Sequence, residues 1–255
     1  MKKKFAEYVI NDESSKIISR EILSSIETEE RKPKWLATIN PHSYVTSQSD
    51  HKFSIALKNS DWLVPDGIGI VIFSTLYGSK LSQRVTGWDI FSNLNKCLNQ
   101  LKGKTVFFLG STNETLSNIS IYMKDNYPQI KVVGMLSPPF KEEFNQKETE
   151  DMIKQINLVS PDVLWVGLTA PKQEKWIYEN INNLNISFAA AIGAVFDFCA
   201  GNVSRAPKWV QDFGLEWLHR SLMSPTRLGK RNFTSNPIFV FIIIKKWMLS
   251  KIYHK

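Results

Sequence analysis

KTVFFLGSTNE, residues 104–114, is the stretch that decides the fold class. Its first part, Lys104 to Gly110, is a continuous apolar run, which is typical of a strand buried on both faces of a parallel sheet. Ser111 to Glu114 then supplies polar residues in the order of a helix N-terminus, and the helix is predicted to extend through Met123. A buried strand followed at once by a helix indicates a β–α unit.

The same alternation continues on both sides of this unit. Further strands are predicted at 35–39, 62–64, 130–134, 162–167 and 187–192. Helices are predicted at 14–26, 44–57, 68–76, 89–101, 147–158 and 172–181. Strands alternating with helices predict a doubly wound α/β fold, in which ligands bind at the carboxyl ends of the strands.

Charge divides the 255-residue chain, whose formal net charge is +8. Residues 1–200 hold 22 Lys and Arg and 22 Asp and Glu, whereas residues 201–255 hold 10 Lys and Arg and two acids, Asp212 and Glu216. A basic segment attached to a neutral domain indicates an anionic partner for that segment. We therefore predict an α/β domain over 1–200 and a basic, aromatic-rich appendage over 201–255.

The appendage contains one apolar run, Pro237 to Ile244, which is eight residues long. A helix needs ~20 apolar residues to span a bilayer, so the run is too short. Because Lys245, Lys246 and Trp247 follow it, the run fits a helix lying in a membrane interface.

Neither end of the chain nor its cysteines indicate secretion. The initial lysines have no apolar core behind them, so they do not form a secretory signal, and we expect the α/β part to remain in the cytoplasm. Cys97 and Cys199 lie far apart without a CxxC spacing, which indicates neither a disulfide framework nor a zinc site.

The strongest candidate for chemistry is Asp66. The strand that ends at Pro65 delivers this acid into a turn with Gly67 and Gly69, where the backbone leaves room for a ligand. A carboxylate in a partly dry loop can act as a general base, because burial raises its pKa. Asp66 also fits as the cap of the following helix, and the two roles are compatible.

Each of the other polar candidates can be explained either by ligand binding or by an ordinary structural role. Thr38 and Asn40 end a strand and either contact a ligand or shape the turn. Arg84 in RVTGWD is a ligand residue or a solvated charge, and Gln173 in PKQE has an ordinary capping explanation. The arginines of the appendage form either a solvated basic face or a phosphate- or membrane-binding face: Arg205, Arg220, Arg227 and Arg231.

Several motifs are absent from the sequence. It contains no GxGxxG, GxxxxGK[ST] or GxSxG, which disfavours dinucleotide-binding dehydrogenases, P-loop NTPases and typical serine hydrolases. It contains no Asp-x-Asp, and its four histidines have no metal-ligand spacing, so no metal site and no cofactor are predicted. A bound diphosphate would be neutralised by arginines and backbone amides.

The order of several longer segments resembles the WecG/TagA/CpsF glycosyltransferase family over about residues 35–232. The segments are TINP, PDGIGIV, RVTGWD, FFLGS, VGLTAPKQEKW, IGAVFDFCAGNVSRAPKW and GLEWLHRSLMSPTRLGKR. The resemblance implies a Rossmann-like α/β fold with a largely parallel sheet flanked by helices, and a helical C-terminal appendage that docks on the membrane and completes the active site.

The resemblance also implies an activity. The family members are metal-independent, inverting transferases that move a sugar, here N-acetylmannosamine or its uronic acid, from a UDP-sugar donor to a lipid acceptor. The expected acceptor is an undecaprenyl diphosphate bearing N-acetylglucosamine, used in cell-surface polysaccharide or teichoic acid synthesis. The protein would then be attached peripherally to the inner face of the bacterial cell membrane, through the contact of its tail with anionic lipid.

Matching positions imply a role for each site residue. Asp66 matches the proposed catalytic base. Thr38, Asn40, Arg84 and Gln173 match residues that bind the substrates, and Arg220, Arg227 and Arg231 match a basic stretch that reaches the donor diphosphate.

Two other functional classes are compatible with part of the sequence. A non-catalytic, peripheral membrane protein that binds nucleotide sugars would keep the basic tail without needing Asp66. Nucleic-acid binding rests on the tail charge alone, so we expect no nucleic-acid partner. Self-association is possible.

Overall fold

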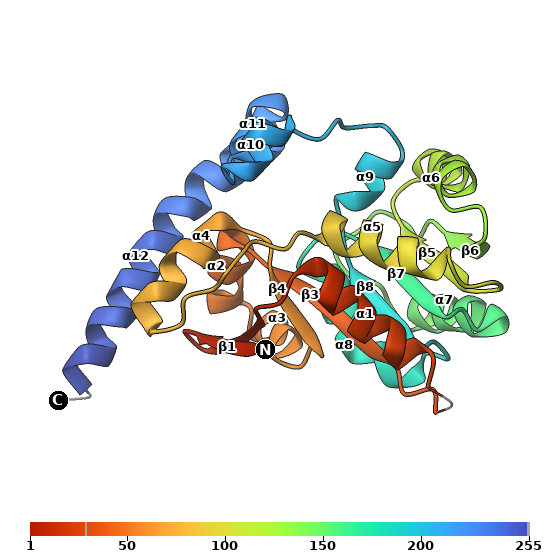
Figure 1. Cartoon of the computed structure of the whole chain (residues 1–255), viewed down its shortest axis with the longest axis horizontal. Helices are drawn as coiled ribbons and strands as arrows, with labels where there is room; N and C mark the ends of the chain where they lie inside the picture. The colour runs from red at the N-terminus through yellow and green to blue at the C-terminus, as the bar shows by residue number, and fades with distance from the viewer. Residues whose placement is uncertain (29, 254–255) are drawn as a thin grey trace.

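A six-stranded parallel sheet forms the centre of the molecule (Figure 1). The computed structural model of the chain describes residues 1–28 and 30–253, without the side chains of residues 212, 227, 228 and 253. The strands lie in the order β4-β3-β8-β7-β5-β6, and all neighbours pair in parallel. Their bounds are β3 Lys34–Ile39, β4 Trp62–Pro65, β5 Thr105–Gly110, β6 Lys131–Leu136, β7 Val163–Gly167 and β8 Phe188–Ala191. The predicted Rossmann-like α/β fold is confirmed.

Side chains leave each strand alternately toward two hydrophobic cores, as the pleat requires. In β3, Trp35 and Ile39 belong to one core, whereas Leu36 belongs to the other. β5 divides its apolar run in the same way, with Phe107 in the first core and Phe108 in the second. The continuous apolar run of residues 104–110 is therefore explained by burial on both faces of the sheet.

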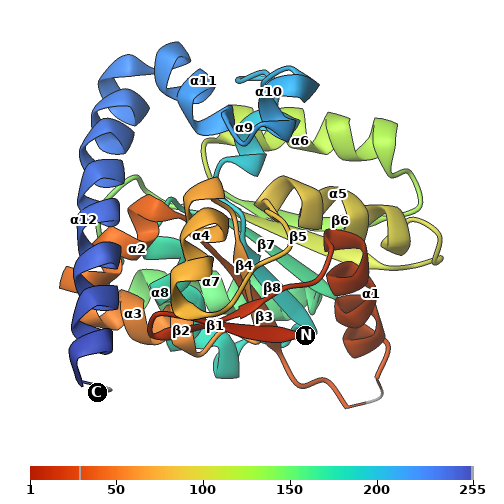
Figure 2. The ribbon, with the colours of Figure 1, turned by 60° about the vertical axis from the view of Figure 1, so that its left-hand side comes forward.

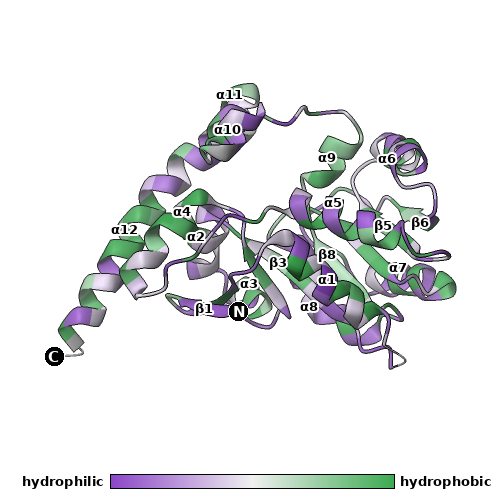
Figure 3. Cartoon of the chain, in the orientation of Figure 1, coloured by the Kyte–Doolittle hydropathy of each residue, from purple (hydrophilic) through white to green (hydrophobic). Residues whose placement is uncertain are grey.

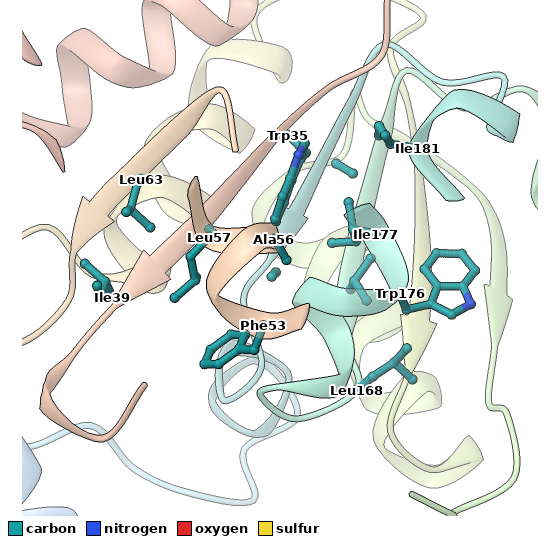
Figure 4. Close-up of a cluster of buried hydrophobic side chains, with 14 of the residues drawn as sticks. Trp35, Ile39, Phe53, Ala56, Leu57, Leu63, Leu168, Trp176, Ile177 and Ile181 are labelled. Atoms are coloured by element: carbon teal, nitrogen blue, oxygen red, sulfur yellow. The ribbon is translucent and has the colours of Figure 1, made fainter. Parts of the chain in front are cut away.

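Helices cover both faces. The helices that pack on the face of Leu36 are α1 Ser15–Ile26, α5 Gly87–Leu98, α6 Asn113–Asn126 and α9 Val195–Cys199. The helices on the opposite face are α2 Pro41–Ser49, α3 His51–Lys58, α4 Ile68–Phe73, α7 Gln146–Val159 and α8 Lys172–Asn180. Figure 4 shows Phe53, Ala56 and Leu57 of α3 in the core with Ile177 of α8 and Trp35.

Two predicted helix boundaries are wrong for local reasons. The helix predicted over 44–57 is two helices, because Asp50 adopts an extended conformation and its side chain caps α3 by accepting a hydrogen bond from the Phe53 amide (2.9 Å). The helix predicted to begin at Asp89 begins at Gly87. Its cap is Thr86, and Asp89 closes the capping box by accepting from the Thr86 amide (3.0 Å).

An N-terminal hairpin, which the sequence did not predict, completes one edge of the sheet. Its strands are β1 Lys2–Phe5 and β2 Tyr8–Asn11, paired antiparallel. Beside the edge strand β4, the Asn11 side-chain oxygen accepts a hydrogen bond from the Leu63 amide over 3.1 Å. The hairpin thus satisfies part of the exposed edge of the parallel sheet.

Helices make up most of residues 208–253. Helices α10 Lys208–Asp212 and α11 Glu216–Met223 lie together at one end of the molecule (Figure 2). Short helical turns occur at Ser74–Tyr77, Ile181–Asn183 and Pro225–Gly229. Helix α12, Lys230–Tyr253, then runs back beside α2.

The apolar run 237–244 lies within α12, whose middle part is coloured hydrophobic in Figure 3. The prediction that this run lies in a membrane interface is wrong for Phe239 and Ile243, because both are buried in the core of the α/β domain. One side of this helix is therefore a protein contact. No helix in residues 1–28 and 30–253 has the length and hydropathy needed to cross a membrane.

Candidate active site

A cavity of 290 Å³ lies at the carboxyl ends of β3, β4 and β8, under α11 and α12. This is the edge of a parallel sheet at which α/β proteins bind ligands. Six of the eight predicted site residues line it: Thr38, Asn40, Asp66, Arg84, Arg220 and Arg231. Four come from the α/β domain and two from the appendage, so both parts of the chain build the cavity.

Asp66 follows directly on β4. Its amide donates a hydrogen bond to the carbonyl oxygen of Ile39 (2.9 Å), which extends the pairing of β4 with β3 by one residue. Helix α4 begins after Gly67 without a side-chain cap, so the capping role considered for Asp66 is wrong. The Asp66 carboxyl group therefore lines the cavity without a structural role in that helix.

Gly67 allows the turn that carries Asp66 to approach α2. A Cβ atom on Gly67 would lie 2.5 Å from Cδ of Pro41 and 3.2 Å from Cβ of Asn40. Any larger residue would push the turn away, so glycine is required at this contact. The close approach brings Asp66 and Asn40 to the same side of the cavity.

Asn40 ends β3 and caps α2 with a capping box. Its side-chain oxygen accepts from the Ser43 amide (3.0 Å), and its own amide donates to Oγ of Ser43 (2.7 Å). Thr38, two residues earlier and opposite Val64 of β4, is half-buried in the cavity wall.

Burial raises the pKa of Asp66 to about 7. The carboxylates of Glu216 and Asp89 act in the same direction, whereas the guanidinium groups of Arg84 and Arg220 oppose the rise. A carboxyl group with this pKa can accept a proton near neutral pH, as a general base must.

Arg84 is held beside Asp66 by the backbone. The amide of Val85, which follows Arg84, donates to the carbonyl oxygen of Pro65, which precedes Asp66, over 2.9 Å. The Arg84 side chain then reaches the appendage, where its Nη2 donates to Oε2 of Glu216 (3.2 Å).

Glu216 and Arg205 are important in this site. Glu216 had no role in the predictions from sequence, and Arg205 was indicated only as one of four arginines on a basic face of the appendage. Arg205 donates to both carboxylate oxygens of Glu216 (3.3 Å each), while its guanidinium group lies over the rings of Trp88 (5.5 Å) and Phe198 (5.9 Å). The one available signal was that Glu216 is one of only two acids in the basic tail.

Two of the three predicted diphosphate-binding arginines line the cavity. The Arg220 guanidinium group lies over the Phe198 ring (5.4 Å), and its buried Nε has no hydrogen-bond partner among the described residues. Arg231, at the start of α12, donates from Nε to the side-chain oxygen of Asn232 (3.4 Å). Arg227 belongs to the turn Pro225–Gly229, but its side chain lies outside the described part of the structure.

His42, which the sequence gave no role, lies in the cavity wall. Its Nδ1 is 2.8 Å from Oγ of Ser235 on α12. Burial and the nearby charge of Arg231 lower the pKa of His42 to about 4. This histidine is therefore neutral at physiological pH and joins α2 to α12 by a hydrogen bond.

Gln173 does not line the cavity. It is buried on α8, where its Nε2 donates to Oε1 of Glu174 (2.9 Å). A Cβ atom on Gly193 would lie 3.5 Å from the Gln173 side-chain amide. Gly193 separates Ile192 from Ala194, which do line the cavity. The structure therefore places Gln173 behind the cavity wall. No cluster of three or more metal-ligating side chains occurs in the part of the chain that the structure describes.

Comparisons with known proteins show the family of the chain. The model of the WecG/TagA/CpsF glycosyl transferase family matches residues 6–252. Proteins named N-acetylglucosaminyldiphosphoundecaprenol N-acetyl-beta-D-mannosaminyltransferase are 30% identical in Bacillus subtilis strain 168 (83% of this chain, 79% of that protein) and 31% in Bacillus spizizenii W23 (88% and 84%). A protein of the same name from Staphylococcus aureus MW2 is 28% identical (83% and 80%). The chain therefore belongs to the WecG/TagA/CpsF family of glycosyltransferases.

Proposed function

We propose that this enzyme transfers N-acetylmannosamine, or its uronic acid, from a UDP donor to an acceptor carrying N-acetylglucosamine on undecaprenyl diphosphate. Such a product is an intermediate of teichoic acid or another cell-surface polysaccharide. The names of the relatives support the sugar and the acceptor. Family membership supports catalysis over the alternative of a protein that only binds nucleotide sugars.

One observation carries the proposal. An acid with a pKa of about 7, Asp66, shares a 290 Å³ cavity with three arginines, Arg84, Arg220 and Arg231. A base and a set of cations at one site are what a sugar transfer with a diphosphate leaving group requires.

The proposed reaction is a direct displacement. The Asp66 carboxylate removes the proton of an acceptor sugar hydroxyl while that oxygen attacks the anomeric carbon of the donor. The new glycosidic bond forms as the bond from the anomeric carbon to the diphosphate oxygen breaks. The attack from the opposite face inverts the anomeric configuration, and UDP leaves with the bonding electrons.

Arginines, rather than a bound metal ion, are proposed to stabilise the leaving group. Arg220, Arg227 and Arg231 would face the donor diphosphate, where charge grows during the reaction. The Nε of Arg220, which has no hydrogen-bond partner in the described part of the chain, supports this role, since such a buried guanidinium N–H is suited to a phosphate oxygen.

Polar residues of the α/β domain would orient the reacting sugars. We propose that Thr38, Asn40 and Arg84 contact substrate directly, because all three line the cavity. Gln173 is proposed to act at the same site through the turn at Gly193, where a Cβ atom would lie 3.5 Å from the Gln173 amide group.

We also propose that residues 201–255 attach the protein to the inner face of the cell membrane. Large apolar side chains remain exposed along this appendage: Trp209, Phe213, Leu222, Met223, Phe233, Phe241 and Ile252. Lys230, Lys245 and Lys251 are exposed on the same helices. Apolar side chains beside lysines are suited to the interface of an anionic membrane.

The proposed activity is tested by following UDP release from UDP-N-acetylmannosamine in the presence of an acceptor with N-acetylglucosamine on a polyprenyl diphosphate. Asp66→Asn should reduce turnover by on the order of 10²-fold or more, because it removes the base. Asp125→Asn makes the same chemical change at an exposed site on α6 and should leave turnover unchanged. Near-normal turnover of Asp66→Asn would refute the assignment, and binding of UDP-sugar without UDP release would favour the non-catalytic alternative.

A further inference from the structure

Glu216 joins the two parts of the chain at the cavity. Its carboxylate is only 6% exposed and accepts hydrogen bonds from Arg84 of the α/β domain and Arg205 of the appendage. Both arginines contact Oε2, at 3.2 and 3.3 Å. A buried carboxylate with two arginine partners is fixed in position much more firmly than an exposed ion pair.

Charged groups approach Asp66 from several elements. Arg84 comes from the loop after α4, Asp89 from α5, and Glu216 and Arg220 from α11. His42 of α2 and Arg231 of α12 line the same cavity. Arg84 is the cation that most favours ionisation of Asp66, and it is also one of the two arginines that Glu216 binds.

Arg84 therefore interacts electrostatically with two carboxylates, those of Asp66 and Glu216. A direct ion pair with Asp66 would occupy the oxygen that must accept a proton, and it would make that oxygen less basic. In the structure the Arg84 guanidinium group donates to Glu216 instead, and the described residues donate no hydrogen bond to the Asp66 side chain.

We propose that Glu216 is a positioning residue, which holds Arg84 together with Arg205 and so leaves the Asp66 carboxylate free to accept the proton of the acceptor hydroxyl. This inference rests on the proposed role of Asp66 as the base. Glu216 lies in the first turn of α11. The base is thus fully competent only when the first turn of α11 is docked over the cavity.

A purely structural role for Glu216 makes a different prediction. An acid in the first turn of a helix also stabilises that helix through its dipole, and the ion pairs hold α11 in place. Loss of such a role would lower stability or the amount of active enzyme. It would leave the pH dependence of the remaining activity unchanged.

The test is the pH profile of turnover for Glu216→Gln, measured by UDP release with the full chain. Without the Glu216 charge, Arg84 turns to Asp66 and favours its ionised form. The acid limb of the profile should therefore move to lower pH by about one unit, and the maximal rate should fall about tenfold, because the base is weaker and occupied. An unchanged acid limb would overturn the proposal.

A double-mutant comparison separates the action through Arg84 from a direct repulsion between Glu216 and Asp66. The pKa of Asp66 is followed by carbon NMR of the aspartate carboxyl groups, with Asp66→Asn providing the assignment. Glu216→Gln should lower this pKa in the wild-type background and change it little in the Arg84→Met background. An equal shift in both backgrounds would refute the action through Arg84.

Glu216→Asp and Asp66→Asn distinguish failure of the Glu216 inference from failure of the base assignment. Glu216→Asp retains the charge with a shorter reach and should give an acid limb between those of wild type and Glu216→Gln. If Glu216→Gln does not fold, an unshifted limb in Glu216→Asp overturns the proposal. If Asp66→Asn is active, the base assignment fails, whereas an inactive Asp66→Asn with an unshifted Glu216→Gln profile contradicts the inference on Glu216 alone.

Discussion

The ring of Phe239 in α12 meets the ring of Tyr44 in α2 edge-on, with 5.4 Å between their centroids. Phe239 also contacts Phe73 (5.7 Å) and is 1% exposed. Aromatic pairs of this geometry add to the stabilisation that comes from burial. The last helix of the basic appendage is therefore part of the hydrophobic core of the α/β domain.

Phe239→Ala should destabilise the protein by about 3 to 5 kcal/mol, because it leaves a cavity among packed rings. Chemical denaturation of the full chain measures this change. Phe241→Ala, two residues further on the exposed side of the same helix, is the matched control and should stay within ~0.5 kcal/mol of wild type. Equal effects of the two changes would contradict the packing of α12.

Membrane attachment should depend on the opposite side of α12. Phe241 and Ile252 are 67% and 66% exposed, so replacing both by serine removes apolar surface without disturbing the core. We expect weaker sedimentation with vesicles that contain phosphatidylglycerol, and an unchanged free energy of unfolding. Undiminished sedimentation of the double variant would refute the proposed membrane face.

Gly67→Ala should damage the active site through backbone displacement. The added methyl group would lie 2.5 Å from Cδ of Pro41, so the turn carrying Asp66 or the start of α2 must move. Turnover should fall by about 10²-fold, the cost of a 1 Å misplacement. At Gly87 an added Cβ meets its nearest atoms at 3.6 Å, so Gly87→Ala controls for the loss of a glycine at the cavity and should be well tolerated.

Asp66 should lower the stability of the native protein at neutral and alkaline pH. Its pKa is about 7 in the folded state, against 3.8 for an ordinary aspartate. Between these values the folded protein holds a proton that the unfolded chain releases, so the contribution of Asp66 to stability falls as pH rises from about 4 to about 7. Above pH 7 it stays at its lowest value.

Asp66→Asn should therefore raise the free energy of unfolding at pH 8 by about 1 to 3 kcal/mol, a range reduced for solvent access through the cavity. Near pH 4 the two proteins should be similar. Denaturation at several pH values checks this difference. A variant that is no more stable than wild type at pH 8 would show that Asp66 ionises without penalty.

Arg220→Lys should weaken UDP binding, although it keeps the positive charge. The Arg220 guanidinium group lies over Phe198, and its Nε has no partner in the described residues; a lysine has neither the planar group nor this Nε donor. We expect about a tenfold or greater rise in the Kd for UDP, measured by calorimetry. Arg31→Lys, in a partly exposed pair with Asp162, should leave this Kd unchanged.

The sequence predicted the parts of this structure that depend on local pattern. Apolar runs such as residues 104–110 are buried strands, and the helix predicted over 14–26 is α1, Ser15–Ile26. Asp66 lies at a strand end for the same reason, since the run before it stops at Pro65. These features follow from the period of the hydrophobic residues and from capping chemistry.

Long-range contacts were beyond that reasoning. Nothing near Glu216 in the sequence indicates that Arg84 is its partner, because the pair depends on how α11 folds back over the sheet. Similarly, Phe239 looks like a membrane residue until Tyr44 and Phe73 are seen around it. Gln173 is the opposite case: it was predicted as a site residue from the PKQE motif, but it lies behind the cavity wall.

The capping box at Asn40 determines which side-chain group of this residue is engaged in the helix cap. Its side-chain oxygen is held by the Ser43 amide, so the NH2 group is left to face a ligand. At this point the wall offers a hydrogen-bond donor, which suits a sugar hydroxyl oxygen or an acetamido carbonyl. In the proposed reaction, this helix cap would select which face of a bound sugar turns toward β3, so the fold itself would take part in substrate discrimination.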